Sequence, residues 1–282
     1  MNAAAQTHER ADGAARIEFG TRPDGPTVLT DLYQRAPCRV LFPIPETGEP
    51  LQAVLLNTSG GLTGGDRIHV EIEVRAHARV TVTTQAAEKL YRALAQDSET
   101  RIDVSMKVGR GAWAEWLAQE TILFDGARLR RRFHADVAPQ ARLLAVETVV
   151  FGRTAMGEWF DTGFLHDAWR IRRGGRLIWA DALHLEGHIT QVRQSPFGFG
   201  TAVACSSLVY VGDDAARLLG EARSLLSECY VHAAATTFDD LLLVRLLADD
   251  AAELRSVVVA LIGGLRKSAA GLPPQLPRVW HC

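Results

Sequence analysis

One run of the sequence alternates between apolar and polar residues with a strict period of two, and this run limits the folds open to the chain. From 67 to 84, the even positions carry Ile, Val, Ala or Thr, and the odd positions carry Arg, His, Glu or Thr. Because successive side chains of a strand point to opposite faces, the run predicts strands with one buried face and one solvent face. The small residues Ala76 and Ala78 predict a bend that divides it into two strands.

The same alternation recurs further along the chain. It predicts strands at residues 102–108, 128–137 and 201–212, and a hairpin over residues 169–181 that turns at Gly174–Gly175. Paired glycines accept the positive φ angles that tight hairpins need. The greater part of the chain is therefore expected to be β-structure.

Helical spacing occurs only toward the C-terminus. Apolar residues recur every three or four positions after Asp213 and again after Asp250, with a turn and a strand predicted at 236–250. Asp250 is the expected N-cap of the second helix, Glu253 the return half of a capping box, and Gly271 the end. Strands followed by two helices predict one mainly β domain over residues 15–282. Both a sandwich and a solenoid fit this periodicity.

Composition narrows the possible partners and the cellular compartment. The net charge is −2, which gives no electrostatic reason to expect nucleic acid or an anionic membrane as a partner. The cysteines, Cys38, Cys205, Cys229 and Cys282, are widely spaced and contain no CxxC pair, as is typical of free thiols in a reducing cytoplasm. Residues 1–14 are expected to form a flexible tail, and they carry no apolar run typical of a secretion signal or membrane span.

The glycine-rich run "NTSGGLTGGDR" at 57–67 resembles a phosphate-binding loop only in composition. Gly65 is followed by Asp66 and Arg67 and then by a strand. A phosphate loop needs a lysine with Ser or Thr at this point, and a helix N-terminus that faces the phosphate. The glycines are instead predicted to shape a tight crossing between strands, where side chains do not fit.

Motifs for catalysis and for tight metal binding are missing from the sequence. There is no GxSxG element, and the histidines lack metal-ligand spacing, so any metal would be held weakly by carboxylates, imidazoles and water. The basic cluster "RLRRRF" places Arg128, Arg130 and Arg132 on one strand face and Arg131 on the other. This cluster favours a charged sheet face or a partner surface over a nucleic-acid patch.

Five stretches in this order resemble one protein family. They are "NTSGGLTGGD" (57–66), "TTQAAEKLYR" (83–92), "WLAQETILFDGA" (116–127), "GRTAMGE" (152–158) and "LPRVW" (276–280). Together they resemble the UreD family of urease accessory proteins, called UreH in some species, from about Phe19 to Trp280. One departure is Ala118, where relatives often carry proline, and it affects only a strand edge.

The resemblance implies a fold and a function. The implied fold is a mainly β, stacked helical β arrangement (β-solenoid-like) with two α-helices near the C-terminus. The implied function is a cytoplasmic, non-catalytic scaffold or chaperone for nickel insertion into urease. Its implied partners are UreF, UreG through UreF, and apo-urease, with a homodimer within the complex, and neither nucleic acid nor membrane. No tightly bound cofactor is implied, and nickel would pass through only transiently.

The resemblance also implies which residues form the site. Acids inside the motifs are candidate stations on a transient nickel pathway, because a moving cation needs weak oxygen ligands: Asp66, Glu120, Asp125 and Glu158. Other motif residues are candidates for structural or interaction roles: Asn57, Thr58, Gly60, Gly61, Gly64, Gly65, Thr84, Gln85, Lys89, Tyr91, Arg92, Gln119 and Gly157. No residue is implied to be catalytic.

One alternative fits the residues without the resemblance. A β-solenoid enzyme that acts on carbohydrate could use carboxylates on a sheet face, and a soluble chain that is active alone would distinguish it from a scaffold. A nickel storage protein is disfavoured, because nine scattered histidines form no histidine-rich tract.

Overall fold

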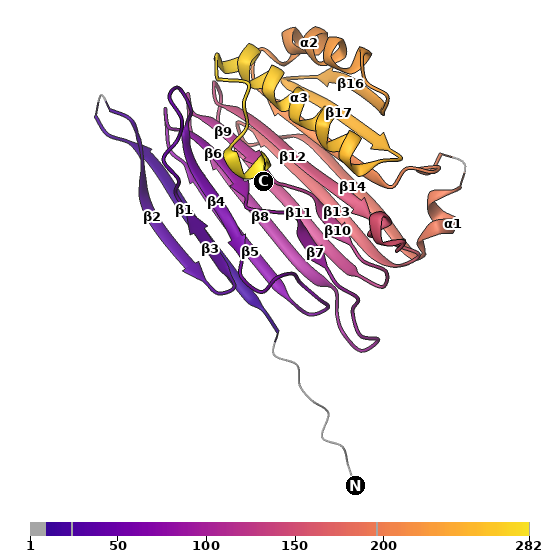
Figure 1. The fold of residues 1–282 in the computed structure, drawn as a ribbon. Coiled ribbons are helices and arrows are strands. Elements are labelled where there is room, and N and C mark those ends of the chain that lie inside the picture. The colour runs from indigo at the N-terminus through magenta and orange to yellow at the C-terminus, as the bar shows by residue number, and fades with distance from the viewer. Residues whose placement is uncertain (1–9, 24, 196, 282) are drawn as a thin grey trace.

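The structure is a computed structural model that describes residues 10–23, 25–195 and 197–281. It is mainly β, with two large sheets and helices gathered at one end (Figure 1). In these ranges, no helix is both long and apolar enough to cross a membrane. The predicted tail, residues 1–14, falls mostly outside the described residues, but its positions 12–14 lie in the first strand, which begins at Asp12.

The first sheet contains seven strands in the order β14-β13-β11-β8-β5-β1-β2. They are β1 (Asp12–Thr21), β2 (Thr27–Arg35), β5 (Arg67–Val74), β8 (Thr100–Val108), β11 (Arg128–Val137), β13 (Thr162–Arg173) and β14 (Arg176–His188). The predicted strands at 102–108 and 128–137 and the hairpin at Gly174–Gly175 are confirmed in this sheet.

The second sheet follows the order β16-β17-β15-β12-β9-β6-β4-β3, with β7 and β10 beside it. Its strands are β3 (Cys38–Leu41), β4 (Leu51–Asn57), β6 (Arg79–Thr84), β7 (Glu88–Leu90), β9 (Trp113–Leu117), β10 (Thr121–Leu123), β12 (Arg142–Phe151), β15 (Ala204–Val211), β16 (His232–Phe238) and β17 (Leu241–Ala248).

The chain winds between the two sheets in coils. β5, β8 and β11 lie in the first sheet, while β6, β9 and β12, which follow them in sequence, lie in the second. Strands one coil apart pair in parallel, so that Val70 lies opposite Val104 and Val80 opposite Ala114. The predicted β-solenoid-like arrangement is therefore confirmed, and antiparallel strands flank the coils, such as β1–β2 and β13–β14.

The predicted bend at Ala76 and Ala78 is the point where the chain passes from one sheet to the other. His77 lies there with a φ of 62°, between the end of β5 and the start of β6. The even positions of both strands face the core between the sheets. Two odd positions of β6 differ from the prediction, because Thr81 and Thr83 are fully buried, whereas Arg79 is exposed as predicted. The face of the second sheet that carries the two threonines is covered here by α3 (Ala251–Ala270) and the C-terminal segment, since Arg266 reaches Glu115 beside Thr81 and Trp280 donates to Thr83.

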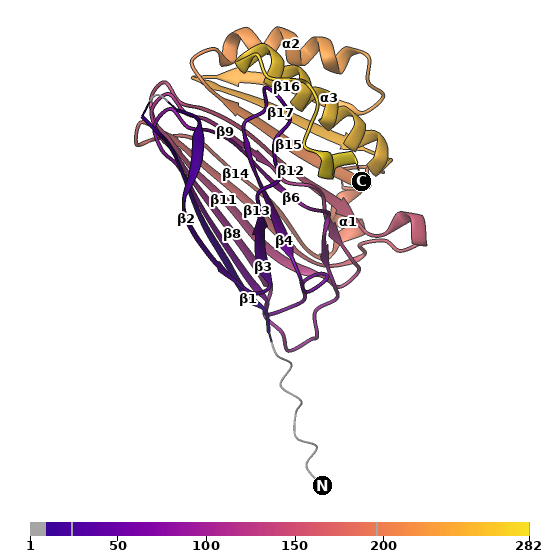
Figure 2. The ribbon, with the colours of Figure 1, turned by 60° about the vertical axis from the view of Figure 1, so that its left-hand side comes forward.

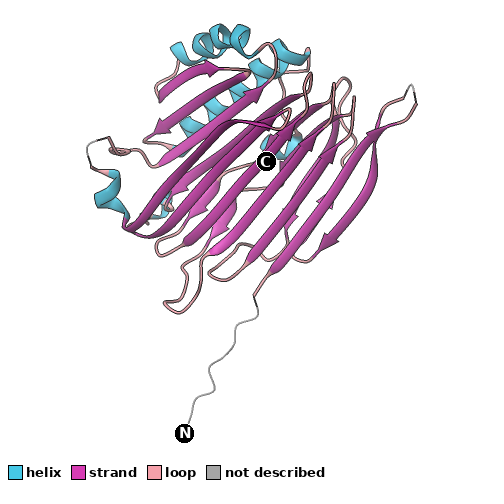
Figure 3. Ribbon diagram, turned by 180° about the vertical axis from the view of Figure 1, so that it is seen from behind, coloured by secondary structure: helices cyan, strands magenta, loops and turns pink. Residues whose placement is uncertain are grey.

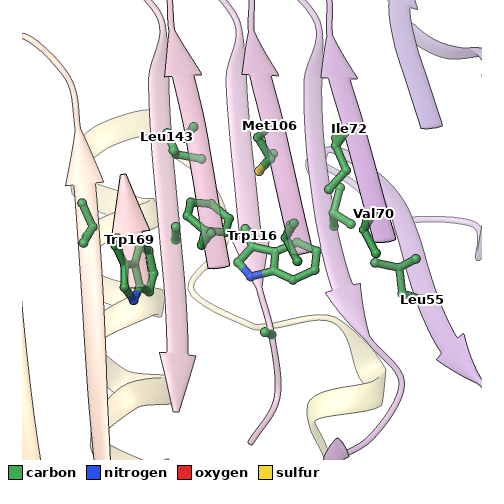
Figure 4. Close-up of a cluster of buried hydrophobic side chains, with 14 of the residues drawn as sticks. Leu55, Val70, Ile72, Met106, Trp116, Leu143 and Trp169 are labelled. Atoms are coloured by element: carbon green, nitrogen blue, oxygen red, sulfur yellow. The ribbon is translucent and has the colours of Figure 1, made fainter. Parts of the chain in front are cut away.

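The main core lies between the sheets and is aromatic at its centre. Phe133 lies between Trp116 and Trp169, with ring centroids 6.1 and 4.8 Å away. Figure 4 shows Trp116 and Trp169 with Met106 and Val70 from neighbouring strands. Aromatic pairs at these separations stabilise a core beyond the area they bury.

A second core lies between the second sheet and the two long helices. α2 (Ala215–Ser227) and α3 (Ala251–Ala270) are the two helices predicted near the C-terminus, and both pack on this sheet (Figure 2). As predicted, the Asp250 side chain caps α3 by accepting from the backbone N–H groups of Ala252 and Glu253, and Gly271 ends it. Three short helices add to these: α1 (Ile189–Arg193), η1 (Thr154–Met156) and η2 (Arg278–His281).

The segment 236–250 contains more strand than predicted. Its first residues are the last residues of β16. The chain then turns at Asp239–Asp240 and continues as β17. β16 is an edge strand with mostly exposed side chains, so its sequence "HAAATT" carries no apolar alternation. Its pairing with β17 comes from tertiary structure.

Candidate functional site

Four of the five sequence motifs meet at one end of the solenoid, where strands of successive coils end. The four segments, 57–66, 83–92, 116–127 and 152–158, are joined by backbone hydrogen bonds. Leu62 donates to Lys89, Tyr91 to Leu62, Phe124 to Leu90 and Gly152 to Leu123, over 2.7–3.0 Å. Each motif therefore rests on the motif of the next coil. We call this region the motif end.

The glycines of 57–66 allow these coils to lie in close contact. Gly61 has a φ of 144°, and a Cβ atom there would lie 2.8 Å from the Lys89 carbonyl oxygen and overlap the Tyr91 ring. A Cβ atom on Gly64 would lie 2.7 Å from the Cβ atoms of Ala93 and Asp97. These contacts support the predicted packing role of the glycines.

A cavity of about 270 Å³ opens at the motif end and runs between the two sheets. Its exposed or half-buried lining includes Asn57, Gln85, Glu88 and Lys89, and its buried lining includes Trp116, Arg131 and Glu147, with further apolar strand residues. The cavity thus leads from motif residues at the surface to charged groups in the core.

Glu88 is a carboxyl group of the cavity lining whose charge changes near neutral pH. The Asn57 side-chain amide lies 3.0 and 3.1 Å from its two carboxylate oxygens. Burial raises the pKa of Glu88 to about 7, and the charge of Asp66 adds to this effect. Cys38 also lines the cavity, and burial together with Glu88 raises the pKa of its thiol to about 11.

Glu88→Gln is expected to change the pH dependence of stability. A carboxyl whose pKa is higher in the folded state stabilises the protein below its unfolded pKa, and this contribution is lost as pH rises through about 7. A glutamine at position 88 does not titrate, so the variant does not lose this contribution. The free energy of unfolding of the variant, relative to that of the wild type, should therefore rise by about 1–3 kcal/mol from pH 5 to pH 8. Urea unfolding at several pH values measures this, with the exposed Glu73→Gln as a control that should show no such trend. A difference that does not vary with pH would contradict the assignment.

A buried ionic cluster forms the inner end of the cavity. Arg131 donates two hydrogen bonds to Asp167 at 2.9 and 2.6 Å, one to Glu147 at 2.5 Å and one to Thr121 at 3.0 Å. Trp116 donates its indole N–H to Glu147 at 2.8 Å. Burial opposes the charge of Arg131, but Asp167 and Glu147 outweigh it and raise the pKa of the guanidinium. The alternation places Arg131 on the opposite strand face from Arg130 and Arg132. Arg131 therefore carries its positive charge into the core.

The four predicted nickel-pathway acids lie outside this cavity. Asp66 accepts from the backbone N–H groups of Ala11 and Thr63, both at 2.8 Å. Glu120 pairs with Arg255 at 2.6 Å. None of the four is among the described residues that line the cavity.

The other two acids lie next to each other at the motif end. Asp125 accepts from the Thr162 backbone N–H at 2.9 Å and pairs with Arg92 at 2.5 Å. Glu158 pairs with Arg153 and accepts from the Asp125 backbone N–H at 3.1 Å. Within the described ranges, no group of three His, Cys, Asp or Glu side chains is placed to hold a metal ion. The nickel role of the four acids stays a prediction.

The predicted interaction residues divide between the cavity and the contacts that build the motif end. Those that line the cavity are Asn57, Gly60, Gly61, Thr84, Gln85, Lys89 and Gln119. Of the others, Thr58 donates to the Pro37 carbonyl, Tyr91 donates to the Gly60 carbonyl, and Gly157 ends η1 with a φ of 71°. Sequence reasoning missed Glu88, although it is the only acid in the motif "TTQAAEKLYR".

The motif end also exposes large apolar side chains. Met156 is 76% exposed and Trp159 49% exposed, in the loop that carries the fourth motif. Tyr91 is 41% exposed, and its ring centroid lies 4.9 Å from that of Phe124. The Arg153 guanidinium lies over the Phe124 ring, 4.2 Å from its centroid. Apolar groups that lie among charged groups on a surface are typical of protein interfaces.

The fifth motif, 276–280, lies beside the cavity. Trp280 donates its indole N–H to Thr83 at 2.9 Å, and the Arg255 guanidinium lies 4.8 Å from the Trp280 ring. Gln119 donates to the carbonyls of Thr84 and Val279 at 3.0 and 3.1 Å. All five motifs therefore belong to one continuous region, and the first three of them line the cavity.

Comparison with known proteins gives a consistent result. The family model described as "UreD urease accessory protein" matches residues 11–281. A urease accessory protein UreD from Magnetococcus marinus is 42% identical over 273 residues, covering 95% of this chain and 93% of the relative. The urease accessory protein UreD 1 of Methylobacterium radiotolerans is 42% identical, covering 99% and 94% of the two chains. A UreD protein from Rhizobium leguminosarum bv. trifolii is 41% identical and covers 100% and 99%. The similarity thus includes the whole motif end.

Proposed function

Because the chain belongs to the UreD family of urease accessory proteins, we propose that it is a non-catalytic scaffold in urease maturation. In this role it joins UreF, and through UreF the protein UreG, to apo-urease in the cytoplasm. It helps to deliver nickel, which is cargo and not a resident cofactor. A homodimer of the chain within this complex stays a prediction.

The observation that carries the proposal is the meeting of all five motifs in one continuous region that includes the cavity. The region combines exposed Met156 and Trp159, ion pairs at Arg92 and Arg153, and a cavity mouth at Glu88. A surface with an apolar centre and charged neighbours suits docking of a protein. We place a partner interface of the scaffold here.

The cavity supplies a weak oxygen station for a passing nickel ion. Glu88 and Gln85 both line it and supply a carboxylate and an amide oxygen, whereas the amide oxygens of Asn57 and Gln119 already accept hydrogen bonds from Ser59 and Arg255. One carboxylate with neutral oxygen donors binds a borderline divalent cation weakly, as transfer requires. Since protons compete for Glu88, its affinity for nickel should rise with pH through about 7.

Glu88→Gln is expected to lower nickel-dependent urease activation in cells, and Glu73→Gln is not.

Charged substitutions at the motif end test the docking role. The double variant Met156→Glu, Trp159→Glu is expected to reduce recovery of a partner about tenfold or more, because two carboxylates would be desolvated in the interface. The measurement is co-purification from cells that express UreF, UreG and apo-urease, together with urease activity.

Ile44→Glu, Tyr230→Glu is the matched control. These two residues are also exposed, at 95% and 100%, but lie outside the five motifs. Both double variants should keep the melting temperature of the wild type. Equal recovery of every partner by wild type and the Met156, Trp159 variant would show that the motif end is not an interface.

A further inference from the structure

The outer face of the first sheet carries an unusual distribution of charge. This face is turned away from α2 and α3, and it faces the viewer in Figure 3. On β5, β8, β11 and β13 the outward positions carry eight cationic side chains: Arg67, Arg101, Lys107, Arg128, Arg130, Arg132, Arg170 and Arg172. The same positions carry four carboxylates: Glu71, Glu73, Asp103 and Asp136. The excess is positive although the whole chain has a net charge of −2.

The strand register brings like charges next to each other. Arg67 lies opposite Arg101, and Arg101 lies opposite Arg130. Next to Arg130 is His166, and burial together with the nearby arginines lowers the pKa of this histidine. Neighbouring strands are about 4.8 Å apart, and like charges placed directly opposite each other destabilise a sheet. The repulsion between these arginines destabilises the free protein. A bound anionic partner would offset this repulsion.

Few carboxylates of the chain itself neutralise this face. Glu99 accepts hydrogen bonds from Arg130 at 2.8 Å and Arg101 at 3.3 Å. The bond from Arg130, a backbone hydrogen bond and the charges of both arginines lower the pKa of Glu99 to about 2. Arg132 reaches Asp103 only at 3.9 Å. Arg170 forms no ion pair within 4 Å with any described residue. Most of the positive charge is therefore available to a partner.

Part of the face is also held in a fixed arrangement. Phe164 points outward but is only 5% exposed, because other side chains cover it. The guanidiniums of Arg128 and Arg130 lie 5.3 and 5.1 Å from its ring centroid, and the His184 ring lies 5.5 Å away. Guanidinium groups fixed on an aromatic ring lose less conformational entropy when they bind an anion.

We propose that the outer face of β8, β11 and β13 is a second interface, which binds a carboxylate-rich protein surface. The inference rests on the proposed function, because the partner is one of the proteins of the maturation assembly. The fork of an arginine side chain matches a carboxylate in bidentate geometry. Asp103 and Asp136 lie among the arginines and would repel a continuous polyphosphate, so a protein surface with mixed charges fits better than nucleic acid.

Charge reversal on this face provides the test. The double variant Arg132→Glu, Arg170→Glu is expected to lose one co-purified partner by about tenfold or more at about 0.15 M salt, since like charges would then face each other. Recovery of that partner by wild type should also fall as salt rises to about 0.5 M. The matched control Arg22→Glu, Arg39→Glu makes the same change in net charge at exposed positions away from this face, and should keep all partners.

The outcomes separate this inference from the proposed function. If wild type recovers partners and the Arg132, Arg170 variant recovers them equally, the second interface is wrong and the scaffold function stands. If wild type recovers none of the three proteins, both fall. A duplex DNA of about 20 base pairs is the competing probe. Binding of this DNA by wild type at about 0.15 M salt, lost in the variant, would assign the face to nucleic acid and overturn the inference.

Discussion

Replacement of Arg131 by leucine is expected to lower the free energy of unfolding by about 3–5 kcal/mol. Arg131, Glu147 and Asp167 form ion pairs in the core with almost no solvent contact. Without the guanidinium, two carboxyl groups would share a buried site without a counter-charge. They would have to take up protons, so the loss should be larger at pH 8 than at pH 5. Urea unfolding at both pH values measures it.

Arg130→Leu is the matched control for this prediction. Arg130 is the next residue of the same strand, but it points outward and its partner Glu99 is near the surface. Partly exposed ion pairs contribute at most about 1 kcal/mol, so this variant should lose little stability. Equal losses in the two variants would show that the buried cluster is not special. A loss at position 131 that is small at every pH would also contradict this account.

Gly61→Ala is expected to cost about 3 kcal/mol of stability and to disrupt partner binding at the motif end. The backbone angle of Gly61 is rare for other residues, and the added Cβ would overlap the Tyr91 ring and lie 2.8 Å from the Lys89 carbonyl. The loop 57–66 would have to move away from the next coil. Urea unfolding gives the stability change, and co-purification of partners gives the effect on docking.

The neighbouring glycine separates the clash from the backbone strain. Gly60 also has a positive φ, 78°, but a Cβ atom there would meet nothing within 4 Å. Gly60→Ala should therefore cost only about 1 kcal/mol and keep partner binding. If the two variants behave alike, close packing between coils is not the reason for glycine at position 61.

Local patterns predicted the elements of this fold, and long-range pairing decided the rest. The alternation at 67–84 predicts two strands and the bend between them, but it does not show that β5 and β6 belong to different sheets. Thr81 and Thr83 read as solvent-facing residues, yet they are buried, because elements nearly 200 residues later in the chain cover their face. Alternation reports which residues share a face, and it carries no information on what covers that face.

The sequence predicted only part of the candidate site. Motif order correctly placed the family, and the structure brings all five motifs to one region. Glu88 could not be singled out, because its burial depends on the stacking of β7 against β10, and its raised pKa depends on that burial and on the charge of Asp66 from another coil. The acids chosen from the sequence, such as Asp66, have backbone or arginine partners that only the folded chain reveals.

Co-purification of the unmodified chain tests the central claim most directly. The chain would carry a tag and be co-expressed with UreF, UreG and apo-urease of the same organism. The account predicts that UreF and urease elute with it in stoichiometric amounts, and that UreG follows only when UreF is present. A soluble monomer that binds none of the three would contradict the scaffold, and carbohydrate binding and hydrolysis would then be the activities to measure.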